Sequence, residues 1–206
     1  YTDDTPLKEL VLKIHSYIQS NPFPEKWLEE KIELFNLLDK MDEDFSNTIW
    51  GKELLQEVEE ELIDSITTLE DIEKSLSYDI ELDKFQQTIR DDIDKLVTLK
   101  NNLNNWDKAF EIYQNLSFAT WPRKKVESEI KEEAKAVRDD IKKKITKSIG
   151  KILICNSVSA NADIYDMYKI LKKLENLILE FDKEFYKRKR DKNIADFNDI
   201  EHFALK

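Results

Sequence analysis

Glycine is scarce in this chain, which has only two glycines among 206 residues. An average soluble protein holds roughly 7% glycine, and both tight turns and phosphate-binding loops depend on it. Gly51 and Gly150 each precede a lysine, but neither pair continues with Ser or Thr or has the upstream glycine of a phosphate loop. The sequence therefore predicts long helices with few tight turns, and no ATP site within this chain.

Cysteine and histidine are almost absent. The single Cys155 excludes an internal disulfide, suits a reducing cytoplasm and is expected to be a small buried apolar residue. His15 and His202 lie far apart and, with one cysteine, form no zinc pattern. No serine has a recognisable His and Asp set for nucleophilic catalysis, so no catalytic residue is predicted. His15 is expected on the surface of a helix.

Long hydrophobic runs are also missing. No apolar run reaches the roughly 18 residues that suggest a transmembrane helix, so we expect no membrane contact. The first four residues are acidic, lack an initiator Met and do not resemble a signal peptide. The last four residues lie inside an amphipathic run. We therefore expect both ends to be cuts through a longer protein.

Hydrophobic residues make up 40% of the chain and charged residues 37%, so a real core and a highly charged surface are both expected. Apolar residues recur every three or four positions, which predicts helices over 7–18, 27–38, 55–72, 82–113, 126–145, 164–185 and from 196 onward. The long runs with charged flanks favour coiled-coil-like packing. We therefore predict an all-α fold, an elongated bundle of about six to seven helices with long antiparallel coiled-coil-like arms.

The charge is unevenly distributed. The net charge is −11, but residues 1–100 hold 11 basic and 26 acidic residues, whereas residues 101–206 hold 22 basic and 18 acidic residues. A surface that faces phosphate is therefore expected in the second half.

Two acidic patterns resemble metal sites. The run from Asp42 to Glu53 places oxygen-bearing residues as a calcium-binding loop does, but Asn47 replaces the required glycine. A polar connection with a helix N-cap at Ser46 is favoured instead. Asp199 and His202 share one helical face and could hold a metal, but a capping or packing role is favoured. No metal site is predicted.

Two basic stretches are candidates for DNA contact. Trp121, Arg123, Lys124 and Lys125 combine three cations with an aromatic ring at an expected helix start, and a ring of this kind can stack on an unpaired base. The second stretch is a run of four cations at the end of a long helix: Lys187, Arg188, Lys189 and Arg190. The alternative for both is a solvated lysine-rich surface, with the second also complementing the helix dipole.

The end of the chain resembles the AddA (RexA) family of helicase–nuclease subunits within the UvrD-like helicase superfamily. The resemblance lies in a helix with a Tyr-Lys-Arg-rich end at 186–190, followed by Asp196-Phe197-Asn198-Asp199-Ile200 and then by Glu201-His202-Phe203-Ala204-Leu205. Near the start, Ser20-Asn21-Pro22-Phe23-Pro24 before Trp27-Leu28 is also similar to this family, as is Trp121-Pro122-Arg123. Residues 45–115 are generic amphipathic helix and add nothing to the resemblance.

The resemblance implies a place in a larger enzyme. Residues 1–206 would form a single helical accessory subdomain inserted into the first motor domain, and residues 194–206 would begin the return into that domain. Asp196, Phe197, Asp199 and His202 would anchor this junction. The parent would be an ATP-dependent DNA helicase and exonuclease of double-strand break repair and recombination. It would act in the bacterial cytoplasm on a duplex end or strand junction, with ATP, magnesium and an AddB-type partner subunit.

The chain itself would then need no cofactor and would not be catalytic alone. The alternative is a non-enzymatic coiled-coil scaffold or adaptor whose end motifs are coincidental.

Overall fold

The computed structural model describes the backbone of residues 4–204 and the side chains of these residues except 201–203. The described part contains only helices and irregular segments and no strand, which confirms the all-α prediction. The helices are α1 (Thr5–Ile18), α2 (Pro24–Glu33), η1 (Leu38–Lys40), η2 (Phe45–Asn47), α3 (Ile49–Leu76), η3 (Ile80–Leu82), α4 (Asp83–Lys100), α5 (Trp106–Gln114), α6 (Glu129–Lys147), α7 (Ile149–Ile152), α8 (Ser157–Asp191) and α9 (Phe197–Ala204). None of the described helices is both long and apolar enough to cross a membrane.

The apolar run over 82–113, expected as one helix, is two. Helix α4 ends at Lys100, and a stretch with four asparagines separates it from α5. Asn105 accepts a hydrogen bond from the backbone N–H of Lys108 (2.8 Å) and so caps α5. Asparagine side chains compete with helical backbone hydrogen bonds and favour caps, which explains the break.

Packing divides the chain into two compact units. Unit 1 comprises Tyr1–Met41 and Asn161–Lys206, and unit 2 comprises Asp42–Ala160. The predicted single accessory subdomain over 1–206, with 194–206 as the start of the return, concerns a place in a larger enzyme and stays a prediction.

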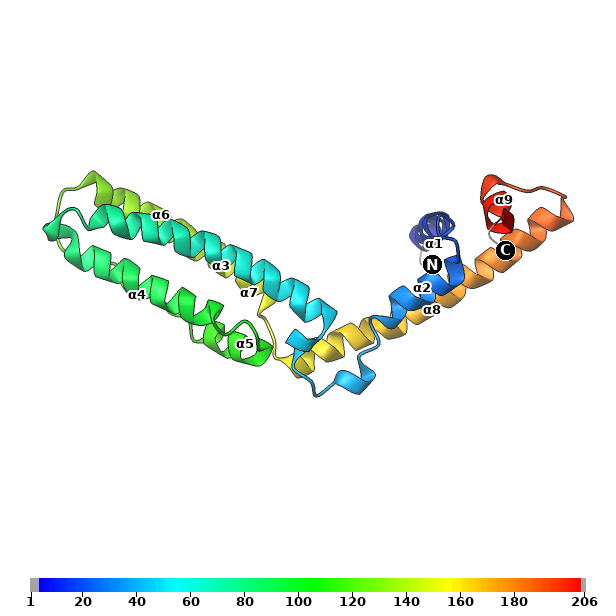
Figure 1. Ribbon diagram of the computed structural model, residues 1–206, viewed down its shortest axis with the longest axis horizontal. Helices are drawn as coiled ribbons and strands as arrows, with labels where there is room; N and C mark the ends of the chain where they lie inside the picture. The colour runs from blue at the N-terminus through cyan, green and yellow to red at the C-terminus, as the bar shows by residue number, and fades with distance from the viewer. Residues whose placement is uncertain (1–3, 205–206) are drawn as a thin grey trace. The chain divides into compact units, whose positions relative to one another are not determined.

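Unit 2 is built around α3, which packs against both α4 and α6 (Figure 1). At 28 residues, α3 is about 42 Å long. Its apolar positions recur every three or four residues and are buried: Leu55, Val58, Leu62, Ile66 and Leu69. The short turn through η3 reverses the chain, so α3 and α4 run antiparallel, as predicted for the long arms.

An irregular segment, residues 116–128, returns from α5 to the start of α6. We call it the linker strip. Lys95 of α4 donates to the Ser117 carbonyl (2.6 Å), Trp121 packs on Phe85 of α4, and Lys124 donates to the Glu81 carbonyl (2.6 Å). The partners in and before α4 are met in reverse order, so the strip runs antiparallel along this helix.

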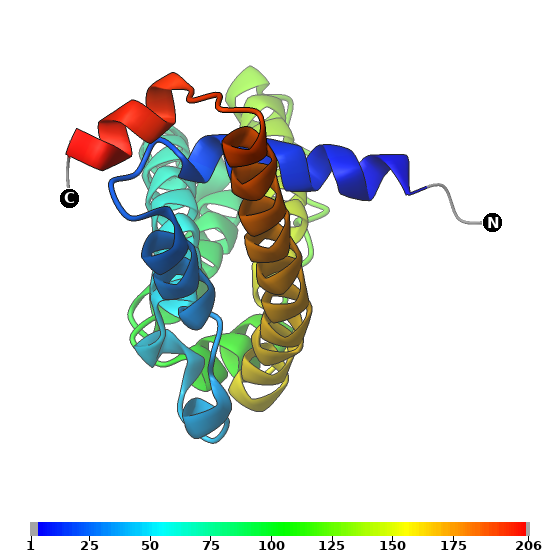
Figure 2. The same cartoon turned by 90° about the vertical axis from the view of Figure 1, so that its right-hand side faces the viewer.

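Unit 1 has its own core, shared by α1, α2 and α8. Figure 2 shows α1 crossing α8 and α2 running beside it. The buried members of this core are Val11, Ile18, Leu28, Ile32 and Ile178. Polar groups close its edge: the Tyr168 hydroxyl donates to Glu33 (2.8 Å), and Lys172 pairs with Glu33 (3.2 Å) and Glu175 (2.8 Å). The hydrogen bond from Tyr168 and the bonds from Asn36 and Lys172 outweigh burial and lower the pKa of Glu33.

Candidate nucleic-acid interface and adjoining groove

The first basic stretch lies in the linker strip rather than at a helix start. Helix α6 begins at Glu129, because Ser128 is its N-cap and accepts from the Lys131 backbone N–H (3.4 Å). The three cations 123–125 therefore precede the helix by several residues. The expectation of cations on the first turn is wrong, since the capping serine determines where α6 starts.

Trp121 is half-buried and already has partners within unit 2. Its ring centroid lies 5.2 Å from that of Phe85, and the Arg138 guanidinium carbon lies 5.4 Å from the indole centroid. These contacts compete with stacking on a nucleic-acid base. Trp121 thus fixes the strip to α4 and α6, and its predicted role in DNA contact stays a prediction.

Arg138 is the buried group that holds this region together. Its Nε donates to the Asp92 carboxylate, both side chains are almost fully buried, and its Nη2 donates to the Ala119 carbonyl (2.6 Å). The other Asp92 oxygen has no hydrogen-bond partner among the described residues. An ion pair thus links α4 to α6, which was not predicted because its members are 46 residues apart.

The three cations of the strip differ in their partners. Lys124 donates to the Glu81 carbonyl and pairs with Asp83 (3.7 Å). Arg123 and Lys125 are exposed and form no hydrogen bond or ion pair with any residue that the structure describes. Both are therefore available to an external anion without breaking an internal contact.

Two apolar side chains that we did not single out from the sequence lie beside these cations. Tyr78 is 79% exposed and Ile80 is 88% exposed, at the turn between α3 and α4. The bond from Lys124 to Glu81 holds the cationic segment against this turn. Figure 1 shows the turn and the start of α6 at the same end of unit 2. An apolar residue between acidic neighbours in a turn is the signal that could have identified them.

The second basic run, in unit 1, is also divided. Arg188 pairs with Glu184 (2.9 Å), and Lys189 pairs with Asp196 (3.0 Å) and Asp199 (2.7 Å). Lys187 and Arg190 are exposed and without a hydrogen-bonding or ionic partner in the described part of the chain. Only these two of the four predicted DNA-contacting cations are uncommitted.

The Asp196–Asp199 motif caps α9. The Asp196 N–H donates to Asp199 (2.9 Å) and the Asp199 N–H donates to Asp196 (3.0 Å), which is the reciprocal pattern of a capping box. Before it, Asn193 has a positive φ of 51° and ends α8. Phe197 is 85% exposed, and the side chain of His202 lies outside those described. Their role at a motor junction stays a prediction.

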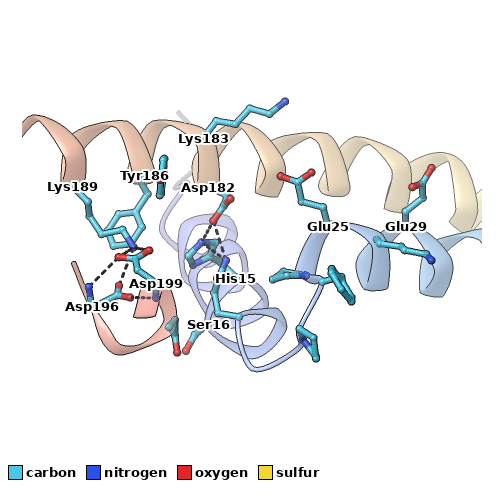
Figure 3. Close-up of a pocket in the computed structure, with 17 residues that line it drawn as sticks. His15, Ser16, Glu25, Glu29, Asp182, Lys183, Tyr186, Lys189, Asp196 and Asp199 are labelled. Carbon is cyan, nitrogen blue, oxygen red and sulfur yellow. Dashed lines mark hydrogen bonds and ion pairs between the residues drawn. The ribbon is translucent and has the colours of Figure 1, made fainter. Parts of the chain in front are cut away.

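A groove of about 810 Å³ lies in unit 1 (Figure 3). At one wall, His15 Nε2 lies 2.7 Å from an Asp182 carboxylate oxygen, and Gln19 donates to the same oxygen (2.9 Å). The His15 ring packs edge-on against Phe181 and Phe185 and is 8% exposed. The expectation of a surface histidine is wrong, because α8 covers this face of α1 through a partner 167 residues away.

The acidic run from Asp42 to Glu53 serves as a connection. Asp44 accepts from the backbone N–H groups of Ser46 (3.0 Å) and Trp106 (2.8 Å), and the N-cap of α3 is Thr48, not Ser46 as predicted. Burial raises the pKa of Asp44, but these hydrogen bonds outweigh it and the net pKa is lowered. Among the described residues no group of His, Cys, Asp or Glu is arranged to hold a metal ion.

No model of a protein family matches this chain. Curated proteins named as the AddA component of an ATP-dependent helicase/nuclease match it over almost its whole length. It is 35% identical to that of Acetivibrio thermocellus over 98% of this chain and 17% of the relative. It is 34% identical to that of Clostridium beijerinckii over 100% of this chain and 17% of the relative, and 31% to that of Ruminiclostridium cellulolyticum over 98% and 16%.

The chain thus spans about a sixth of the length of these relatives. The matches also cover the generic middle, which coincidental end motifs do not explain. The chain therefore belongs to the AddA family of ATP-dependent helicase/nuclease proteins, as a match to one segment of these longer chains.

Proposed function

We propose that this chain is the DNA-engaging accessory helical subdomain of an ATP-dependent helicase/nuclease, inserted into its first motor domain. The observation that carries the proposal is the end of unit 2 at the turn between α3 and α4. There the unpaired cations Arg123 and Lys125 lie beside the exposed side chains of Tyr78 and Ile80. Cations gain by displacing counterions from phosphate, and an exposed ring or aliphatic side chain can contact an unpaired or opened base.

In this proposal the chemistry belongs to the rest of the parent protein. The parent unwinds and degrades DNA ends in double-strand break repair and recombination, using ATP and magnesium, together with an AddB-type partner in the bacterial cytoplasm. This chain positions the duplex or the strand junction. We expect a pure sample to hydrolyse neither ATP nor DNA, and turnover that co-purifies with the chain would contradict this.

Fluorescence anisotropy with a labelled forked DNA at low salt tests the proposal. The double variant Arg123→Glu/Lys125→Glu removes two cations that make no internal contact, so the fold should be retained. We expect binding to weaken by about tenfold or more, since two phosphate contacts become repulsions. The matched control is Lys52→Glu/Lys108→Glu, which changes the net charge equally. Lys52 lies near the start of α3 and Lys108 in α5, away from the turn between α3 and α4.

Equal affinity of the Arg123→Glu/Lys125→Glu variant and the unmodified chain would reject this surface. The run in unit 1 is tested separately by Lys187→Glu/Arg190→Glu. Lys189 is left unchanged there, because its ion pairs with Asp196 and Asp199 hold the start of α9.

A further inference from the structure

The groove in unit 1 has no role in DNA contact as proposed above, and the charges along it are predominantly negative. Its lining includes five carboxylates, Glu25, Glu29, Asp182, Asp196 and Asp199, and three lysines, Lys26, Lys183 and Lys189. Lys189 is neutralised by Asp196 and Asp199. Figure 3 shows Lys183 extending away from the His15–Asp182 pair. A phosphate backbone would therefore be repelled from this groove.

One wall of the groove is formed by two glutamates with no internal partner. Glu25 and Glu29 lie one turn apart on α2, and both are exposed. Neither forms an ion pair or side-chain hydrogen bond with a residue that the structure describes, and Figure 3 shows both projecting from α2 toward α8. Two adjacent, unpaired carboxylates attract a cation that can bridge them, and the planar guanidinium of arginine suits that geometry.

The rim of the groove supplies aromatic rings. Phe23 is 64% exposed, Tyr186 is 41% exposed and Phe185 is 39% exposed, and all three line the groove. Arginine stacks on aromatic faces while its donors pair with carboxylates, so rings beside carboxylates favour arginine over a metal ion or a lysine. Across the described residues no cluster is arranged for a metal.

We propose that this groove binds an arginine-bearing segment of the same helicase/nuclease polypeptide, from outside the stretch 1–206. This rests on the proposed function, in which the chain is one segment of a longer protein. Relatives carry more than four-fifths of their length outside the matched stretch. Exposed ion pairs contribute only about 0–1 kcal/mol each, too little to hold a separate protein. A covalently connected segment reaches roughly millimolar effective concentration, at which such contacts suffice.

Photo-crosslinking in the complete parent protein tests this. p-Benzoylphenylalanine replaces Phe23 at the rim of the groove, and the crosslinked peptide is identified by mass spectrometry. We expect a crosslink to an arginine-containing peptide of the same polypeptide outside 1–206. In a Glu25→Gln/Glu29→Gln background its yield should fall by about threefold or more, because the paired carboxylates are lost.

The matched control is Glu53→Gln/Glu57→Gln, another exposed pair one turn apart, on α3 in unit 2. This control should leave the crosslink yield unchanged. Crosslinks only to another protein, crosslinks only within 1–206, or a yield indifferent to Glu25→Gln/Glu29→Gln would each overturn the proposal.

Forked-DNA binding separates this proposal from the proposed function. The Glu25→Gln/Glu29→Gln variant should bind DNA like the unmodified parent protein. If the crosslink fails while Arg123→Glu/Lys125→Glu still weakens DNA binding, the groove assignment alone is wrong. If DNA binding ignores Arg123 and Lys125 while the crosslink forms, the proposed function fails and the groove assignment remains.

Discussion

At the scale of single residues, the two glycines differ in what surrounds them. Gly51 lies in the first turn of α3, where an added Cβ would meet the Phe45 carbonyl oxygen at 2.0 Å. That oxygen is fixed by a hydrogen bond from the Thr48 hydroxyl (2.7 Å). At Gly150 an added Cβ would meet the hydroxyl of Tyr113 at 2.5 Å, the end of a side chain that can move.

We therefore predict opposite balances for the two alanine variants. Alanine favours a helix over glycine by about 1 kcal/mol, but overpacking against fixed backbone costs about 1–3 kcal/mol or more. Gly51→Ala should lower the free energy of unfolding in urea, and Gly150→Ala should change it by less. Equal effects of the two variants would show that α3 can shift away from Phe45 without loss.

At the scale of elements, the buried ion pair holds α4 and α6 together across the linker strip. Arg138→Met leaves the Asp92 carboxylate buried without its partner, so we predict a loss of about 3–5 kcal/mol in urea unfolding. The double variant Asp92→Leu/Arg138→Met should lose less, because no charge remains buried. Lys143→Met, which breaks an exposed pair with Asp140, should cost about 1 kcal/mol or less. A loss from Arg138→Met as small as that from Lys143→Met would contradict this role.

Helix α9 depends on its capping carboxylates and should therefore respond to acid. Burial raises the pKa of Asp196, but the Asp199 backbone N–H and the Lys189 ammonium outweigh it, so the net pKa is lowered. A carboxylate with a lowered pKa in the folded state stabilises that state above its ordinary pKa. This stabilisation is lost as pH falls through the lowered value.

We predict that the ¹³Cα secondary shifts of α9 decrease below about pH 4. Helix α6 is the control, because its N-cap Ser128 does not titrate there. Loss of helical shifts in both helices at the same pH would indicate general unfolding rather than decapping.

At the scale of the whole molecule, a net charge of −11 opposes DNA binding, so any binding must depend on a few placed cations. Each phosphate contact contributes about 0.7 to the slope of log K against log salt for single strands and about 0.9 for duplex DNA. We predict that Arg123→Gln/Lys125→Gln reduces this slope by about 1.4–1.8, measured by anisotropy between roughly 50 and 200 mM salt. An unchanged slope would mean that neither residue contacts phosphate.

Much of the fold could be predicted from the sequence because apolar spacing is a local signal. The positions of Leu55, Val58 and Leu62 predict both α3 and its buried face. The interpretation failed where the deciding partner is distant in sequence. His15 is buried by Asp182, and no pattern around His15 indicates this.

The candidate site was predictable only in outline, for the same reason. Composition identifies the cationic runs, but not which cation is neutralised. Lys189 and Arg190 are neighbours in sequence, yet only Lys189 faces Asp196 and Asp199. The side on which each side chain leaves α8 decides this, together with the turn at Asn193 that brings α9 back.

The linker strip has a consequence for how relatives of this chain should diverge. Lys95, Lys131 and Arg138 hold the strip by donating to the carbonyl oxygens of Ser117, Val126 and Ala119. Every amino acid carries that oxygen, so evolution can exchange the side chains at 117 and 119 while the attachment persists. The three donors in α4 and α6 have no such freedom. Substitutions over time should therefore accumulate in the irregular segment and spare the helical cations that bind it.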